Sequence, residues 1–115
     1  MNDEVIKYGL PLSAIEKICA VFAKFSEIDK AILYGSRAKG NFKTGSDIDL
    51  TLFGEKLDSS LSGKIAEALD DLLLPYMIDL SIYAELNHAE LQEHIDRVGV
   101  IFYQSLHNHE TDRVR

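Results

Sequence analysis

One stretch of the chain constrains its fold more than any other. It runs from Ile32 to Leu52 and reads ILYGSRAKGNFKTGSDIDLTL. A short apolar run ends at Gly35, a loop rich in glycine, serine, threonine and lysine follows, and a second apolar run then opens with two aspartates one residue apart. Short apolar runs bounded by turn residues are typical of buried strands. The stretch therefore predicts two strands joined by a basic loop, which the rest of the chain is expected to hold in place.

Helical and extended patterns alternate outside this stretch. Capping boxes at Ser13 with Glu16 and at Asn87 with Glu90 predict two helix starts, because each polar pair precedes apolar residues at helical spacing. Helices are expected over about 13–25, from caps at 58–60 to Pro75, and from Asn87 to Gly99, and strands over 31–34, 48–53, 76–83 and 100–103. This alternation indicates an α/β domain with a small sheet.

Composition limits the class of protein. The 115 residues are expected to form one domain over 1–105 and a polar tail over 106–115. A formal charge of -7 argues against a long phosphate backbone as the main partner, so no direct nucleic-acid binding is expected. The single cysteine cannot form a disulfide within the chain, and no apolar run suits a signal peptide or a membrane span. We therefore expect a cytoplasmic protein without membrane contact.

Aspartates recur on one side of two predicted strands. Because alternate residues of a strand face opposite sides, Asp47 and Asp49 share a face with Thr51, and Asp79 lies on one face of the third strand. A turn before a solvated strand would explain the D-x-D pair alone, but not the third aspartate. If the strands are neighbours, three carboxylates repel one another, and a cation usually relieves that repulsion. Oxygen ligands favour Mg²⁺, or Mn²⁺, as one ion or a pair.

The loop between the two strands is the most basic short segment of an acidic chain. Gly35 and Ser36 can present backbone N–H groups and a hydroxyl to an anion. Arg37, Lys39 and Lys43 add positive charge beside them. The loop lacks the lysine that a Walker motif requires. These five residues are candidates for binding a polyphosphate, with the loop holding the outer phosphates and the metal the reacting one.

Other polar residues are assigned no chemistry. His88, His94, His107 and His109 show no metal-ligand spacing and are expected on the solvated surface. Cys19 falls on the apolar stripe of the first predicted helix and is expected in the core rather than as a reactive thiol.

The combined pattern resembles that of a known family. Gly35-Ser36, ten further residues, Asp47-x-Asp49 and a later Asp79 are similar to the motif of the nucleotidyltransferase fold in the DNA polymerase beta superfamily. The texts YGSRAKG and SDIDL are most similar to its minimal (MNT) branch, which includes antitoxins paired with HEPN-domain toxins. The resemblance covers about residues 13–103 and implies an α+β type fold with a mixed sheet of three to four strands.

The resemblance also implies a role for each motif residue. Asp47 and Asp49 would ligate two Mg²⁺ ions that bind the triphosphate, and Asp79 would complete the ion near the attacking hydroxyl and help remove its proton. Gly35 and Ser36 would contact the β- and γ-phosphates. In-line attack on the α-phosphate would release pyrophosphate.

Phosphate binding and partner choice follow from the same resemblance. Arg37 would add charge to the phosphate site, and Lys39 and Lys43 are further candidates. Larger relatives carry a second domain that binds the acceptor, so a separate helical partner is expected here, namely a HEPN toxin neutralised by transfer of AMP from ATP, or of another nucleotide, to a tyrosine. Two alternatives remain open: an antitoxin that acts by contact without catalysis, and a subunit that modifies a small molecule such as an aminoglycoside.

Overall fold

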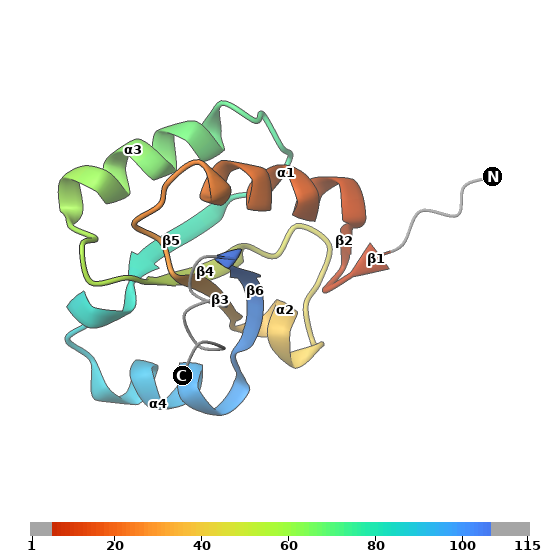
Figure 1. The fold of residues 1–115 in the computed structure, drawn as a ribbon. Coiled ribbons are helices and arrows are strands. Elements are labelled where there is room, and N and C mark those ends of the chain that lie inside the picture. The colour runs from red at the N-terminus through yellow and green to blue at the C-terminus, as the bar shows by residue number, and fades with distance from the viewer. Residues whose placement is uncertain (1–5, 107–115) are drawn as a thin grey trace.

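The computed structural model describes residues 6–106 and shows a four-stranded mixed sheet with helices on both faces (Figure 1). The strands of this sheet are β3 (Lys30–Tyr34), β4 (Ile48–Phe53), β5 (Ile78–Ile82) and β6 (Val100–Gln104). The helices are α1 (Leu12–Ala23), α2 (Ser36–Lys39), α3 (Ser59–Asp70) and α4 (Ala89–Val98), with a 3-10 turn, η1, at Tyr83–Glu85. In Figure 1, α1 and α3 lie above the sheet and α4 lies below it.

The order and directions of the strands bring the ends of three strands together at one end of the sheet. The order is β5-β4-β3-β6, in which β3 runs antiparallel to β4 and β6, and β4 runs parallel to β5. Parallel neighbours need a crossover connection, and α3 supplies it between β4 and β5. The C-terminal end of β3 therefore meets the N-terminal ends of β4 and β5.

The main core lies between the sheet and the helices α1 and α3. Ile48, Leu50 and Leu52 alternate along β4 and are inaccessible to solvent, as are Phe22 of α1 and Ile65 of α3. Each such side chain stabilises the fold by about 1.5–3 kcal/mol through burial. This face of the sheet is therefore closed, and chemistry that needs solvent access belongs to the other face.

A smaller apolar cluster covers part of that other face. Ile95 of α4 packs with Ile32 and Tyr34 of β3. Helix α4 therefore covers the β3 side of the face, whereas Asp79 on β5 remains exposed.

Most of the elements expected from the sequence are confirmed. Strand β4 has the predicted bounds, β3 and β6 each extend one residue further, and β5 is shorter than expected. The cap predicted at 58–60 is Asp58, whose Oδ1 accepts a hydrogen bond from the Leu61 N–H at 2.8 Å, although α3 ends before the predicted limit at Pro75. The predicted mixed sheet and α/β class are also confirmed.

Two predicted helix caps are wrong by a residue or more. Helix α1 begins at Leu12, after Pro11, and no side chain caps its start, so the Ser13 capping box does not form. The fixed φ of Pro11, -64°, already suits the approach to a helix. Helix α4 is capped by His88 rather than Asn87, because the His88 Nδ1 accepts the Leu91 N–H at 3.2 Å.

The first described residues form a short hairpin. Strands β1 (Ile6–Lys7) and β2 (Leu10–Pro11) pair in antiparallel fashion. The two residues between them, Tyr8 and Gly9, both have positive φ, 58° and 74°, as a type I′ turn requires. Tyrosine is uncommon in this conformation, so the turn carried little sequence signal.

Two further expectations concern the C-terminal tail and the absence of a membrane-spanning segment. The predicted tail over 106–115 lies outside the described residues except for Leu106. Within residues 6–106, no helix combines the length and apolar character needed to cross a bilayer.

Candidate active site

One residue from each of three neighbouring strands lies in a row across one end of the sheet. The register pairs Tyr34 of β3 with Asp49 of β4, and Asp49 with Asp79 of β5. Asp47 directly precedes β4 and stands two residues before Asp49. The predicted pairing of Asp49 with Asp79 is therefore observed, and Asp47 lies close enough for its charge to act on the Asp49 carboxyl.

The aspartates influence one another electrostatically. Partial burial raises the pKa of Asp49, and the negative charges of Asp79 and Asp47 raise it further. Among residues 6–106, no three His, Cys, Asp or Glu side chains already stand close enough to form a complete metal site. The three carboxylates nevertheless offer only oxygen ligands and repel one another, and this donor chemistry fits Mg²⁺ or Mn²⁺.

Gly35 joins β3 to α2 in a conformation that is essentially restricted to glycine. Its φ is 77° and its ψ is -155°. A Cβ atom at this position would overlap the Oδ2 atom of Asp49. Ser36 follows as the first residue of α2, and its carbonyl accepts the Gly40 N–H at 2.9 Å. The Gly-Ser turn therefore lies directly against a carboxylate, and the two motifs form one site.

Arg37 is 3% exposed and bonds to backbone carbonyls. Its Nε and Nη2 donate to the Ser46 carbonyl at 3.1 and 2.8 Å, and its Nη1 donates to the Tyr8 carbonyl at 2.9 Å. The rings of Phe42 and Tyr76 each lie 5.4 Å from the guanidinium carbon. The donors that the sequence assigned to phosphate are thus engaged, in this structure, in holding the residue that precedes the first aspartate.

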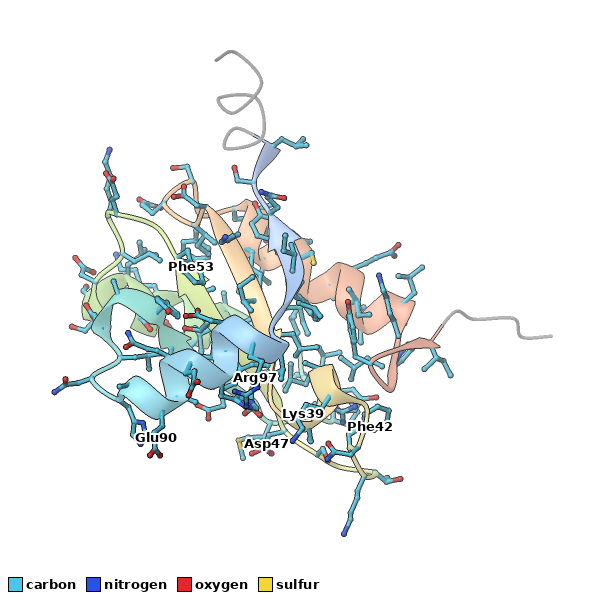
Figure 2. All side chains as sticks on the ribbon, turned by 90° about the horizontal axis from the view of Figure 1, so that it is seen from below. Lys39, Phe42, Asp47, Phe53, Glu90 and Arg97 are labelled. Atoms are coloured by element: carbon cyan, nitrogen blue, oxygen red, sulfur yellow. The ribbon has the colours of Figure 1, made fainter. Side chains whose placement is uncertain are left out.

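The two lysines of the loop remain exposed. In Figure 2, Lys39 of α2 and Asp47 lie on the same side of the molecule. Lys43 lines a cavity of about 530 Å³ together with Tyr76. The backbone N–H of Lys43 donates to the Ser46 hydroxyl at 2.8 Å. This bond closes the loop just before the first aspartate.

Hydroxyl groups lie beside the carboxylates, and the sequence alone assigned them no role. Ser81 Oγ donates a hydrogen bond to Thr51 Oγ1 at 2.9 Å. These two residues are paired across β4 and β5, two positions further along each strand than Asp49 and Asp79. Burial raises the pKa of Tyr34, a hydrogen bond with Ser81 opposes that change, and Asp79 and Asp49 raise the pKa further. The alternation that aligned the aspartates also aligned these hydroxyls, so the signal was present in the sequence.

Of the two described histidines, one departs from its expected place. His94 is partly buried, and its ring stands edge-on to Tyr34 with centroids 6.2 Å apart, so the expectation of a solvated surface position is wrong for it. His88 is exposed but serves as a helix cap. His107 and His109 lie outside the described residues.

Cys19 is partly buried and packs against the main core. Its Sγ donates to the Phe102 carbonyl at 3.4 Å, and burial, with a smaller effect of Glu16, raises the pKa of the thiol to about 11. The thiol is therefore protonated at neutral pH and is a weak nucleophile. It lines a cavity of about 580 Å³ between α1 and the end of β6, which is the edge strand opposite β5.

This fold and site define a class of protein. A small mixed sheet that holds a Gly-Ser turn against three aspartates of neighbouring strands is the arrangement of a nucleotidyltransferase. Residues 16–108 match the family model described as "Polymerase beta, Nucleotidyltransferase", and the chain belongs to that family. The resemblance stated from the sequence is therefore confirmed.

Several solved structures with the same fold are toxin–antitoxin complexes. One, determined with AMP-PNP, is 20% identical, with a TM-score of 0.65 over 87% of this chain and 81% of the other. The MNT antitoxin in complex with a tri-AMPylated Shewanella oneidensis HEPN toxin is 18% identical, with a TM-score of 0.61 over 87% and 77%. The MntA-HepT complex is 18% identical, with a TM-score of 0.61 over 90% and 80%. No curated protein sequence matches this chain.

Proposed function

We propose that this protein is a Mg²⁺-dependent nucleotidyltransferase that transfers AMP from ATP to a protein partner, and that it acts in this way as an antitoxin. The observation that carries the proposal is the contact between the Gly35 backbone and the Asp49 carboxylate, in register with Asp79. The partner would be a HEPN-domain toxin, and the solved complexes with AMP-PNP and with a tri-AMPylated HEPN toxin support this choice.

Each motif residue has a place in the proposed reaction. Asp47, Asp49 and Asp79 would hold Mg²⁺, which when bound stabilises the charge of the triphosphate and of the transferring group. The Gly35 backbone and the Ser36 hydroxyl orient the outer phosphates. Asp79 accepts the proton of the attacking hydroxyl.

The basic residues divide into two roles in this proposal. Lys39 and Lys43 are exposed and offset phosphate charge. Arg37 positions the loop through its bonds to Ser46 and Tyr8. Holding both reactants in line is the main catalytic contribution in phosphoryl transfer, so a rigid loop matters as much as its charge.

The location of Asp79 suits a large acceptor. Strand β5 stands at the edge of the sheet, and Asp79 is exposed on it, whereas α4 covers the β3 side of the same face. A tyrosine of a folded partner can therefore approach from the β5 side. The proposal includes a cytoplasmic location, in keeping with the single, protonated thiol.

The test is intact-mass spectrometry of the HEPN-type partner after incubation with the protein, Mg²⁺ and each ribonucleoside triphosphate in turn. We expect a mass gain of one or more AMP units with ATP, and none with Asp79→Asn. Glu55→Gln is the matched control, because it removes one exposed carboxylate from the turn after β4, at the other end of that strand.

Other results would point to the alternatives. A stable complex that protects cells without any mass gain would favour an antitoxin that acts by contact alone. Modification of an aminoglycoside in the absence of a protein acceptor would favour a small-molecule transferase. Transfer by the Asp79→Asn variant at the wild-type rate would contradict the assigned role of Asp79.

A further inference from the structure

We propose that Arg97, in the last turn of α4, binds a phosphate group of the nucleotide, so that α4 forms a second wall of the site. The inference rests on the proposed function, because it names a further contact for the same substrate. It starts from the placement of Arg37, whose guanidinium is almost inaccessible and bonded to carbonyl oxygens. Any guanidinium that contacts phosphate beside Lys39 and Lys43 therefore comes from another part of the chain.

The end of α4 lies against the strand that leads into the Gly-Ser turn. Gly99, which follows the helix, approaches Ile32 of β3 so closely that an added Cβ would stand 2.5 Å from the Ile32 Cγ2 atom. The next residue, Val100, pairs with Leu33. The last turn of α4 is therefore fixed beside the end of β3, two residues before Gly35.

A second contact connects α4 to the row of aspartates. The His94 ring stands edge-on to Tyr34, 6.2 Å between centroids, and Tyr34 is paired with Asp49. Arg97 follows His94 by three residues, so the two side chains lie on neighbouring positions of one helix face. The His94 side of α4 therefore lies against Tyr34, the β3 residue that is paired with Asp49, and Arg97 is next to it on the helix surface.

The side chain of Arg97 is available for a ligand. It is exposed, and it forms no hydrogen bond or ion pair with any residue in the range 6–106. In Figure 2, Arg97, Lys39 and Asp47 lie on the same side of the molecule, contributed by α4, α2 and the start of β4. A planar guanidinium suits phosphate oxygens, which it can bind through two parallel hydrogen bonds.

A simpler role for Arg97 would be to stabilise the negative end of the α4 dipole. That role affects the stability of the helix but not the affinity for phosphate. The two roles therefore separate in a binding measurement.

The test is isothermal titration of the purified protein with ATP and with inorganic tripolyphosphate, both in excess Mg²⁺. Arg97→Gln is expected to weaken both ligands by about 10- to 100-fold, because a charge-assisted hydrogen bond is lost. Arg97→Lys keeps the charge without the planar fork, so its affinity should fall between the two. Lys17→Gln is the matched control, because it removes an exposed charge from α1 on the opposite face. Thermal melting of each variant confirms that it is folded.

The outcomes separate this inference from the proposed function. If Arg97→Gln binds both ligands as tightly as wild type while Asp49→Asn does not, the inference is overturned and the proposed function stands. Equal losses in Arg97→Gln and Lys17→Gln would indicate a general charge effect and also overturn it. If the wild-type protein binds neither ligand, the proposed function fails and the inference fails with it.

Discussion

Replacing Gly35 by alanine adds one methyl group where the structure has a carboxylate oxygen. The backbone at Gly35, with φ 77° and ψ -155°, belongs to a region that only glycine adopts readily. Forcing another residue into it costs about 1–3 kcal/mol. For a domain of this size, each kcal/mol lowers Tm by about 4–8 °C. We therefore expect a protein that still folds but melts at a lower temperature.

The larger effect of Gly35→Ala is expected on activity. The atom that the new Cβ would overlap is the Oδ2 of Asp49, the end of a side chain that can rotate away. Rotation relieves the overlap at little cost in stability, but it moves a carboxylate out of the site. A displacement of about 1 Å can lower the rate about 100-fold, so AMP transfer should fall at least by that factor.

Gly40→Ala is the control for the backbone term. Gly40 also has positive φ, 89°, but nothing lies within 4 Å of an added Cβ. It should lose stability and keep transfer. If Gly35→Ala transfers AMP at the wild-type rate, or if both variants lose activity equally, the idea that the turn and the carboxylate interlock is refuted.

Three further predictions concern stability. Partial burial and the charges of Asp79 and Asp47 raise the pKa of Asp49. The folded state therefore binds a proton at Asp49 more tightly than the unfolded chain does. As a result, the free energy of unfolding falls as pH rises from the ordinary pKa to the raised pKa. In the absence of metal, Asp49→Asn should therefore be more stable than wild type at pH 7 by about 0.2–1 kcal/mol, and this difference should vanish below pH 3.8. Urea titrations at pH 7 and below pH 3.8 measure it. Arg37→Met removes three hydrogen bonds to carbonyl oxygens and should lower the free energy of unfolding by about 2–4 kcal/mol, with Arg37→Lys in between; a loss under about 0.5 kcal/mol would contradict the assigned bonds. Asp58→Ala removes the cap of α3 and should cost about 1 kcal/mol in the same assay, whereas Asp58→Asn should be close to neutral.

Strand alternation allowed much of the site to be predicted. The period of two residues placed Asp47 and Asp49 on one side of β4, and the register then brought Asp79 beside them. This prediction requires only that β4 and β5 are neighbouring strands and run in the same direction. The same alternation would have identified Thr51 and Ser81, whose hydroxyls are bonded beside the aspartates.

Features that depend on tertiary contacts were not predictable in this way. The burial of Arg37 depends on the hairpin and on Tyr76, which are distant in sequence. The position of His94 depends on how α4 packs against Tyr34. Local sequence patterns predict the environment of a residue from its neighbours in the chain, and they carry no information on contacts with distant residues.

The bonds of Arg37 join the N-terminal hairpin to the loop that precedes Asp47. One guanidinium donates to the Tyr8 carbonyl in the hairpin and to the Ser46 carbonyl next to Asp47. The conformations of the two segments are therefore thermodynamically linked, and such linkage is reciprocal. If this protein binds a nucleotide as proposed, a nucleotide that orders the loop should also slow hydrogen exchange in the hairpin, and a ligand that loosens the hairpin should weaken the affinity for the nucleotide.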